Sequence, residues 1–275
     1  GTYRDTIKNL KRGEDATIVV APARIFSGRI LLGDSGKPSA NTRIKIWSSQ
    51  QEQLGSLVYI EGKTDATGRF RLNPYPGVRF GIIAYPPPGT PYLTREVKNL
   101  RWNADTPEEN LEIRLDKVVL AEGTVVDAQT GQPLNGASVQ YEPEGANNKR
   151  NTDEIVTGWQ GIQKTDATGK FSIPVLPGPG TLLVHAESPK YILQETDSST
   201  LYRSKPGGMR IYAHDFQKID PVTDQRLEPM KIELHPGETV TGTLVDEQGK
   251  PINEALMISR LKILPTSPSW RGWSD

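Results

Sequence analysis

A repeated stretch of six residues constrains the fold of this chain more than any other feature of its sequence. Lys63–Gly68 and Lys164–Gly169 both read Lys-Thr-Asp-Ala-Thr-Gly. Each copy is followed by apolar residues that alternate with polar ones, and then by a Pro-Gly pair, Pro76-Gly77 or Pro177-Gly178. Alternation with a period of two predicts a half-buried β-strand. The repeat therefore indicates successive copies of one small β module.

Two further landmarks recur three times each. A Gly-x-Pro turn follows a short β-type run, at Gly36 and Pro38, Gly131 and Pro133, and Gly249 and Pro251. The runs open at Gly28, Gly123 and Gly242. An alternating strand ends eight positions before each opening glycine. These strands are Ala16, Ile18, Val20; Leu111, Ile113, Leu115; and Met230, Ile232, Leu234. The constant spacing predicts that one module leads directly into the next.

The landmarks divide the chain into four parts. Residues 1–20 are predicted to be the C-terminal strands of a preceding module, and 21–115 a complete first module. Residues 116–236 form a second module with long loop insertions, and 237–275 the N-terminal strands of a truncated third module. We therefore expect this chain to be a piece of a longer tandem array.

Each complete module contains about seven short strand patterns separated by turn signals, with no helical period. This pattern predicts an all-β chain of tandem, seven-stranded antiparallel β-sandwiches of the Ig-like or prealbumin-like kind. The inward positions of the first module are Ile44, Ile46, Phe70, Leu72, Phe80, Ile82 and Ala84. Those of the second are Val139, Tyr141, Phe171, Ile173, Leu182, Val184 and Ala186.

The order of these motifs resembles the carboxypeptidase regulatory-like family, whose domains are transthyretin-like, or prealbumin-like, sandwiches. In the second module the matching residues are Gly123, Val125, Asp127, Gly131, Pro133, Leu134, Ala137, Val139, Thr165, Asp166, Gly169, Phe171, Pro177 and Gly178. The first module departs by having Gly33 where an acid is common, with Asp34 beside it. The third stops after Ala255.

The resemblance implies a fold and a setting more than an activity. Members of the family are mostly accessory modules, found in tandem in large bacterial surface, secreted and membrane-anchored proteins. The resemblance therefore implies an extracytoplasmic location, whether cell surface, periplasmic or secreted. It supplies no catalytic residues and no cofactor.

Composition excludes several classes of partner. Lys and Arg number 33, and Asp and Glu also number 33, so the chain lacks the basic surplus of a nucleic-acid binder. No apolar stretch approaches the ~20 residues of a membrane helix, so no membrane insertion of these residues is expected. The absence of cysteine excludes disulfides and thiolate zinc sites.

The acids and histidines of the repeat fit structural roles better than metal binding. Asp65 and Asp166 each offer one carboxylate, whereas Ca²⁺ prefers six or more oxygens. We expect both to cap hairpin turns in which Gly68 and Gly169 adopt positive φ. The histidines, His185, His214 and His235, lack the spacing of a zinc pair, so we predict no metal site and no cofactor.

Aromatic residues on the long loops of the second module are the candidates for ligand binding. Trp159 lies in the loop 142–163, and Tyr191, Tyr202 and Tyr212 lie in the insertion 187–229. Exposed rings on loops can stack on sugars or hold peptides. The alternative is that these rings pack the insertion onto its own sandwich.

One covalent possibility is left open by the sequence. Similar surface sandwiches sometimes carry a Lys–Asn cross-link promoted by a buried acid. Lys117 and Lys231, near the ends of the alternating strands, are candidate lysines, but the sequence selects no pair.

The sequence favours a non-enzymatic spacer in a multidomain extracytoplasmic protein, with the neighbouring modules of the same chain as its partners. A first alternative is a module that binds a polysaccharide or a surface protein through the long loops. A second alternative is an accessory part of a hydrolase whose catalytic domain lies outside these residues.

Overall fold

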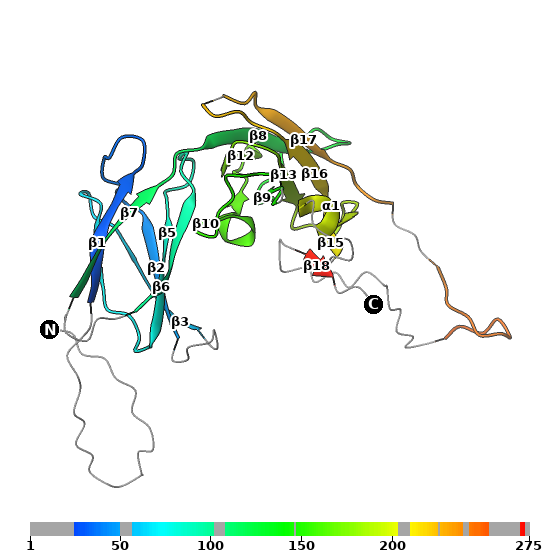
Figure 1. Cartoon of the computed structure of the whole chain (residues 1–275). Helices are drawn as coiled ribbons and strands as arrows, with labels where there is room; N and C mark the ends of the chain where they lie inside the picture. The colour runs from blue at the N-terminus through cyan, green and yellow to red at the C-terminus, as the bar shows by residue number, and fades with distance from the viewer. Residues whose placement is uncertain are drawn as a thin grey trace, which may run out of the picture. The chain divides into compact units, whose positions relative to one another are not determined.

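The computed structural model describes residues 25–49, 57–101, 108–145, 147–202, 210–224, 226–238, 242–252 and 270–272. The chain divides into two compact units (Figure 1). The first holds the chain up to Leu120 together with Asn151–Thr157, and the second holds Ala121–Arg150 and the chain from Gly158 onward. The predicted parts 1–20 and most of 253–275 lie outside the described residues.

The first unit contains seven consecutive strands in two facing sheets. They are β1 (Ile25–Leu32), β2 (Arg43–Ser49), β3 (Leu57–Lys63), β4 (Arg69–Leu72), β5 (Arg79–Tyr85), β6 (Thr94–Leu100) and β7 (Glu108–Leu115). One sheet has the order β4-β1-β7. The other has the order β10-β6-β5-β2-β3, in which β10 (Ile155–Val156) comes from the segment Asn151–Thr157 of this unit.

Alternating side chains from both sheets fill the core of the first unit. Ile44 and Ile46 of β2 are buried opposite Ala84 and Ile82 of β5, as the period-two pattern predicts. Phe26 contributes an edge-to-face contact with Phe80, which the sequence patterns did not single out. The complete core cluster is Phe26, Ile30, Ile44, Ile46, Phe70, Phe80, Ile82, Ala84, Ile113 and Leu115. Leu72 packs against it while partly exposed.

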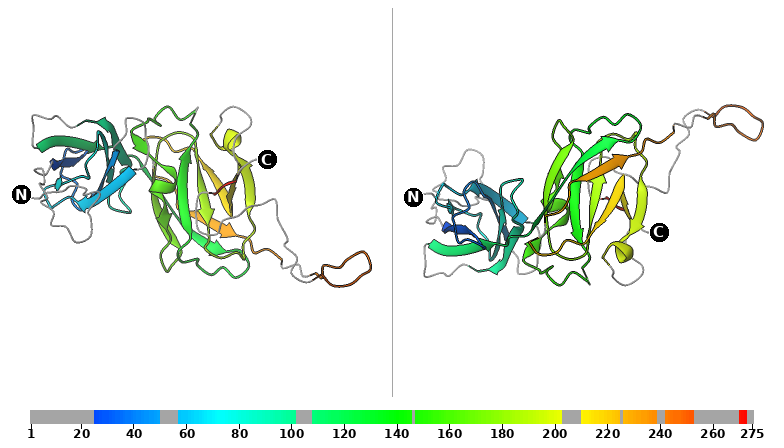
Figure 2. Two further views of the ribbon diagram at one scale, coloured as in Figure 1. Left: turned by 90° about the horizontal axis from the view of Figure 1, so that it is seen from below. Right: turned by 90° about the horizontal axis from the view of Figure 1, so that it is seen from above.

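The second unit repeats the plan with added elements, as Figures 1 and 2 show. Its elements are β8 (Val119–Asp127), β9 (Ser138–Pro143), the 3-10 helix η1 (Gly158–Gly161), β11 (Gln163–Lys164), β12 (Lys170–Val175), β13 (Gly180–His185), β14 (Gln194–Asp197), α1 (Ser198–Tyr202), β15 (Arg210–Ala213), β16 (Asp215–Ile219), β17 (Met230–Leu234) and β18 (Trp270–Gly272). Sheet β12-β8-β17 faces sheet β11-β9-β13-β16, and β14-β15-β18 form a small third sheet.

The all-β class and the tandem sandwiches predicted from the sequence are confirmed, with one difference in strand direction. The first and last strands of each unit are neighbours and run parallel. β1 pairs with β7 from Ile25↔Glu108 to Leu32↔Leu115, and β8 pairs with β17 in the same sense. The sequence analysis expected antiparallel sheets throughout. Alternation of apolar residues fixes which face of a strand is buried and says nothing about the direction of its neighbour.

The repeated six-residue motif forms the same turn in both units. Asp65 Oδ1 accepts hydrogen bonds from the backbone N–H groups of Thr67 and Arg69, at 2.8 and 2.9 Å. Asp166 does the same for the equivalent residues of its own turn. Gly68 and Gly169 both adopt φ +73°. The geometry is the capped hairpin turn expected from the Asp-Ala-Thr-Gly sequence.

The buried threonine of the same motif ties this turn to the rest of the unit. Thr64 Oγ1 accepts the Thr42 N–H at 2.9 Å and donates to the Ser39 carbonyl at 2.7 Å. Thr165 Oγ1 likewise accepts the Ala137 N–H at 2.9 Å and donates to the Leu134 carbonyl at 2.5 Å. Both hydroxyls therefore satisfy backbone groups that burial would otherwise leave unpaired.

The insertion of the second unit packs on its own sandwich. Leu183 of β13 points away from the main core and joins a small cluster above the sheet. The cluster consists of Leu183, Leu201, Ile211 and Ala213, with Tyr202 and Phe216 packed against it. This third layer explains why every residue of β9 and β13 is buried, whereas a sandwich strand normally exposes alternate residues.

Candidate functional site

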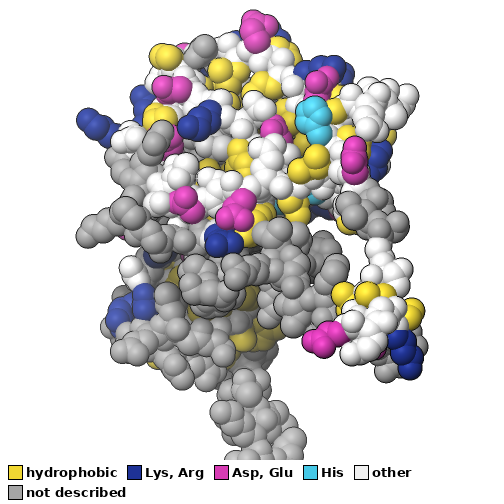
Figure 3. Space-filling view, turned by 90° about the vertical axis from the view of Figure 1, so that its right-hand side faces the viewer, with side chains coloured by type: hydrophobic (Ala, Val, Ile, Leu, Met, Phe, Trp, Pro, Cys, Tyr) yellow, Lys and Arg dark blue, Asp and Glu magenta, His cyan; other side chains and the backbone are white. Residues whose placement is uncertain are grey.

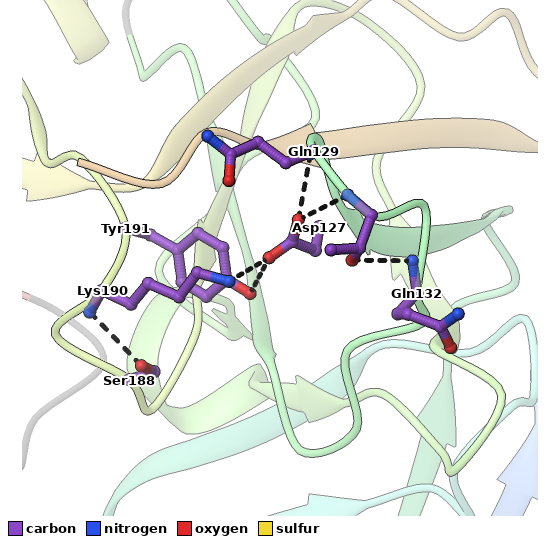
Figure 4. A network of polar contacts seen from close by, with 7 residues as sticks. Asp127, Gln129, Gln132, Ser188, Lys190 and Tyr191 are labelled. Atoms are coloured by element: carbon purple, nitrogen blue, oxygen red, sulfur yellow. Dashed lines mark hydrogen bonds and ion pairs between the residues drawn. The ribbon is translucent and has the colours of Figure 1, made fainter. Parts of the chain in front are cut away.

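A polar network around Asp127, at the end of β8, is the most elaborate side-chain arrangement in the second unit (Figure 4). Asp127 Oδ1 accepts the backbone N–H groups of Gln129 and Thr130, at 3.0 and 2.9 Å. Its Oδ2 accepts Lys190 Nζ at 2.6 Å and the Tyr191 hydroxyl at 3.0 Å. Asp127 is only 2% exposed, so these four donors replace the water that a buried carboxylate loses.

The network fixes the charge states of its members. The hydrogen bond from Lys190 is the largest of several that hold the pKa of Asp127 well below its usual range, against the opposing effect of desolvation. Burial, together with the hydrogen bond to Asp127, raises the pKa of Tyr191 to about 12. Asp127 therefore stays ionised and Tyr191 stays a donor across the physiological pH range.

Backbone bonds hold the donor residues in place at one end of the unit. Ile192 N–H donates to the His235 carbonyl at 2.9 Å, and Gly237 N–H donates to the Lys190 carbonyl at 2.8 Å. Tyr191 also forms an isolated β-bridge with Pro236. The network thus joins the end of β8, the segment after β13 and the residues just beyond β17. We call the contacts of Asp127 with Lys190 and Tyr191 the second-unit lock.

The first unit has a counterpart built on Asp34. The Tyr92 hydroxyl donates to Asp34 Oδ1 at 2.9 Å, and Lys117 Nζ lies 3.3 Å from Asp34 Oδ2. Tyr92 forms an isolated β-bridge with Lys117, as Tyr191 does with Pro236. Tyr92 and Tyr191 therefore occupy equivalent places. We call the contacts of Asp34 with Tyr92 and Lys117 the first-unit lock.

The two locks use different positions for the same chemistry. Gly36 N–H donates to Leu32 O, and Gly131 N–H donates to Asp127 O, both at 2.8 Å, so Leu32 stands where Asp127 does. The sequence comparison that placed Gly33 opposite the acid was wrong by one position. In the first unit the carboxylate comes from the turn, at Asp34, and it is more exposed than Asp127. Because each lock keeps a tyrosine, an acid and a lysine, we infer that the contact itself matters to the module.

Two of the three histidines are buried beside the second-unit lock. The rings of His185 and His214 lie 5.8 Å apart, and the His214 ring lies 6.0 Å from that of Tyr191. His214 Nδ1 accepts the Ala186 N–H at 2.9 Å, whereas His185 Nε2 is buried without a partner. Desolvation, together with the nearby His214, lowers the pKa of His185 to about 4, and desolvation lowers the pKa of His214. Both rings are therefore neutral near pH 7, whereas His235 is exposed.

The four aromatic candidates for ligand binding do not form an open platform in the described residues. Tyr191 and Tyr212 are buried, and Tyr202 packs against the Leu183 cluster. Trp159 lies in η1, and its side chain is outside the described part of the chain. The structure also shows that Tyr191 belongs to the basic module plan, as the equivalent of Tyr92, and is not part of the insertion.

The other candidate chemistry of the chain is engaged in structural contacts. Lys117 and Lys231, the lysines considered for a Lys–Asn cross-link, form ion pairs with the carboxylates of Asp34 and Glu233. Within the described residues, no group of three or more His, Asp or Glu side chains could hold a metal ion. On the face shown in Figure 3, acidic and basic side chains are interspersed and form no patch of one sign among the coloured atoms.

The locks were not found from the sequence, although a signal was present. Lys190-Tyr191-Ile192 and Pro91-Tyr92-Leu93 both come after a buried strand and place a tyrosine before an aliphatic residue. Assigning Tyr191 to the insertion hid this repeat. No helix in the described part of the chain has the length and apolar character needed to cross a membrane.

The comparisons with known proteins find similar structures but no family. No family model matches the chain, and no curated protein matches it, so the resemblance to the carboxypeptidase regulatory-like family stays a prediction. The shaft pilin SpaA from Lactobacillus rhamnosus GG is similar at 12% identity and a TM-score of 0.32, over 80% of this chain and 100% of that one.

Two further solved structures show the same level of similarity. The minor pilin GBS52 of Streptococcus agalactiae has 12% identity and a TM-score of 0.31, over 80% of this chain and 99% of that one. The Bacillus anthracis TIE protein has 15% identity and a TM-score of 0.27, over 84% of this chain and 40% of that one. Similarity at this level is compatible with the β-sandwich architecture described above and decides nothing about function.

Proposed function

We propose that the two units are non-enzymatic spacer modules that carry tension along the chain. The observation that carries this proposal is the parallel pairing of the first and last strand in each unit. The neighbouring modules of the same chain would be its partners. An extracytoplasmic location remains a prediction from the family resemblance.

Parallel terminal strands resist pulling because of where the chain enters and leaves. The chain enters the first unit at Ile25, at the start of β1, and leaves it at Leu115, at the end of β7. Because the strands are parallel, these two points lie at opposite ends of the pair. Tension on the chain therefore pulls the strands past each other and loads all their hydrogen bonds together. If the strands were antiparallel, both points would lie at one end and the bonds would open one at a time.

The locks brace the same place. Lys117 comes directly after β7, and Tyr191 bridges Pro236 just after β17, so each lock holds the point where the chain leaves its unit. A charge-assisted hydrogen bond is shorter and about twice as strong as a neutral one. The buried Asp127 makes two such contacts with side chains from another segment. We expect these contacts to delay the departure of β17 from β8.

Single-molecule force spectroscopy tests the proposal, and the absence of cysteine makes the attachment sites clean. Pulling the whole chain from its two ends loads β1 against β7 in shear. A matched variant with Lys37→Cys and Asp116→Cys attaches the handles at one end of the same strand pair, because Lys37 lies after β1 and Asp116 after β7. We expect a several-fold lower unfolding force for the first unit in this second geometry. Equal forces in the two geometries would refute a tension-bearing role.

A further inference from the structure

The hairpin at residues 242–252, drawn in orange in Figure 1, repeats the opening of both complete units. Ile252 N–H donates to the Leu244 carbonyl at 2.9 Å, as Leu134 N–H does to Val125 O. Val245 bridges Pro251, as Val126 bridges Pro133. Asp246 caps the turn by accepting the backbone N–H groups of Gln248 and Lys250. The hairpin is therefore a correctly formed first strand and turn of a third module.

This hairpin exposes apolar side chains that the complete units bury. Leu244 is 56% exposed, whereas its equivalents Ile30 and Val125 are 0% exposed. Val245 and Ile252 are also largely exposed, at 47% and 45%. A folded protein rarely leaves adjacent apolar side chains in water unless another surface covers them.

The complete units show what covers the equivalent residues. The last strand of each unit pairs in parallel with its first strand and places an apolar residue beside the buried one. Ile113 lies opposite Ile30 in the first unit, and Ile232 lies opposite Val125 in the second. The first strand at 242–246 has no such neighbour among the described residues.

The chain contains one segment with the chemistry of this missing neighbour. Ala16, Ile18 and Val20 alternate in the same way as Leu111–Leu115 and Met230–Leu234 and have the same spacing from the next opening glycine. The other two strands of this kind are already paired, with β1 and β8. In the register of the complete units, Ile18 would lie opposite Leu244.

We propose that residues 242–252 bind the strand at residues 16–20 of a second copy of this chain, in parallel register, so that copies associate head to tail. In each complete unit, the last strand leads directly into the first strand of the next module. Pairing between copies reproduces this connection. The contact is heterologous, since the two surfaces differ, so it can continue into open rows of copies.

Light scattering and analytical ultracentrifugation of the whole chain test the proposal. We expect the average mass to rise with concentration beyond that of a dimer. Ile18→Asp removes the strand that is offered and Leu244→Asp removes the surface that accepts it, so each variant alone should have the monomer mass. An equimolar mixture of the two should form a one-to-one dimer and nothing larger, because each variant keeps one competent end.

The controls separate this contact from general stickiness. Val222→Asp changes another exposed apolar residue, 67% exposed, and should leave the association unchanged. Should Ile18→Asp also disturb the first unit, a labelled peptide of residues 13–22 provides a second test, and it should bind the Ile18→Asp chain and not the Leu244→Asp chain. A monomeric wild-type chain at all concentrations, association that survives both substitutions, or a mixture that stays monomeric would overturn the proposal.

Discussion

Acid should destabilise the second unit well before its carboxylates titrate, because His185 is buried and neutral. Its pKa is about 4 in the folded unit, and an unperturbed histidine has a pKa of about 6.5. Between these values the unfolded chain binds a proton that the folded unit does not. Stability is therefore complete above about pH 6.5, falls as the pH drops toward 4, and falls no further from this residue below that.

The size of the loss can be worked out from the same two pKa values. A difference of one pKa unit corresponds to about 1.4 kcal/mol, so His185 alone accounts for roughly 3 kcal/mol between pH 7 and pH 4. The pKa of His214 is also lowered and acts in the same direction. The Asp127 carboxylate does not titrate in this window, because its pKa lies well below its usual range. The loss between pH 6.5 and 5 therefore belongs to the histidines.

Urea unfolding at a series of pH values, combined with hydrogen exchange at the β13 amides, measures this loss in the second unit. The matched variant is His185→Phe, which keeps a ring at the site and removes the titrating group. We expect its unfolding free energy to depend less steeply on pH between 6.5 and 4.5 than that of the wild type. A wild-type free energy that is flat over this range, or an unchanged slope in the variant, would show that the reasoning is wrong.

The locks and turns give two further predictions for chemical denaturation. Tyr191→Phe removes a donor to a buried carboxylate, so it should lower the unfolding free energy of the second unit by roughly 1–2 kcal/mol, with Tyr92→Phe costing the first unit less because Asp34 is more exposed. Gly169→Ala should destabilise its unit more than Gly131→Ala. Both glycines have positive φ, but a Cβ on Gly169 would meet the Val125 carbonyl oxygen at 2.6 Å, whereas one on Gly131 meets nothing within 4 Å. Equal losses at the two glycines, or a silent Tyr191→Phe, would contradict the corresponding geometry.

The features that could be predicted from the sequence are those that repeat over short distances. The period-two rows placed Ile44, Ile46, Val139 and Tyr141 in the two cores, because a strand buries alternate residues whatever its neighbour is. The hairpin turns could be predicted from Asp65 and Gly68, since an aspartate cap and a positive φ are local requirements.

The features that could not be predicted depend on residues far apart in the sequence. Asp127 meets Lys190 at a separation of 63 positions, and the first-unit lock draws its acid and its lysine from different places in the module. Comparing the two repeats position by position therefore fails to align these groups. The parallel pairing of β1 with β7 is likewise invisible to alternation, which is the same for either strand direction.

The pairing of first and last strands also has a consequence for how the protein is made. As the chain leaves the ribosome, β1 appears first and must wait for β7, the last strand of its unit, before its ladder can close. Contacts between such distant parts of a chain close slowly, because the intervening segment must be ordered first. Each unit is therefore expected to complete its fold only after nearly all of it has been synthesised. Until then the open edge of its first strand is a site where a nascent chain could pair with the wrong neighbour.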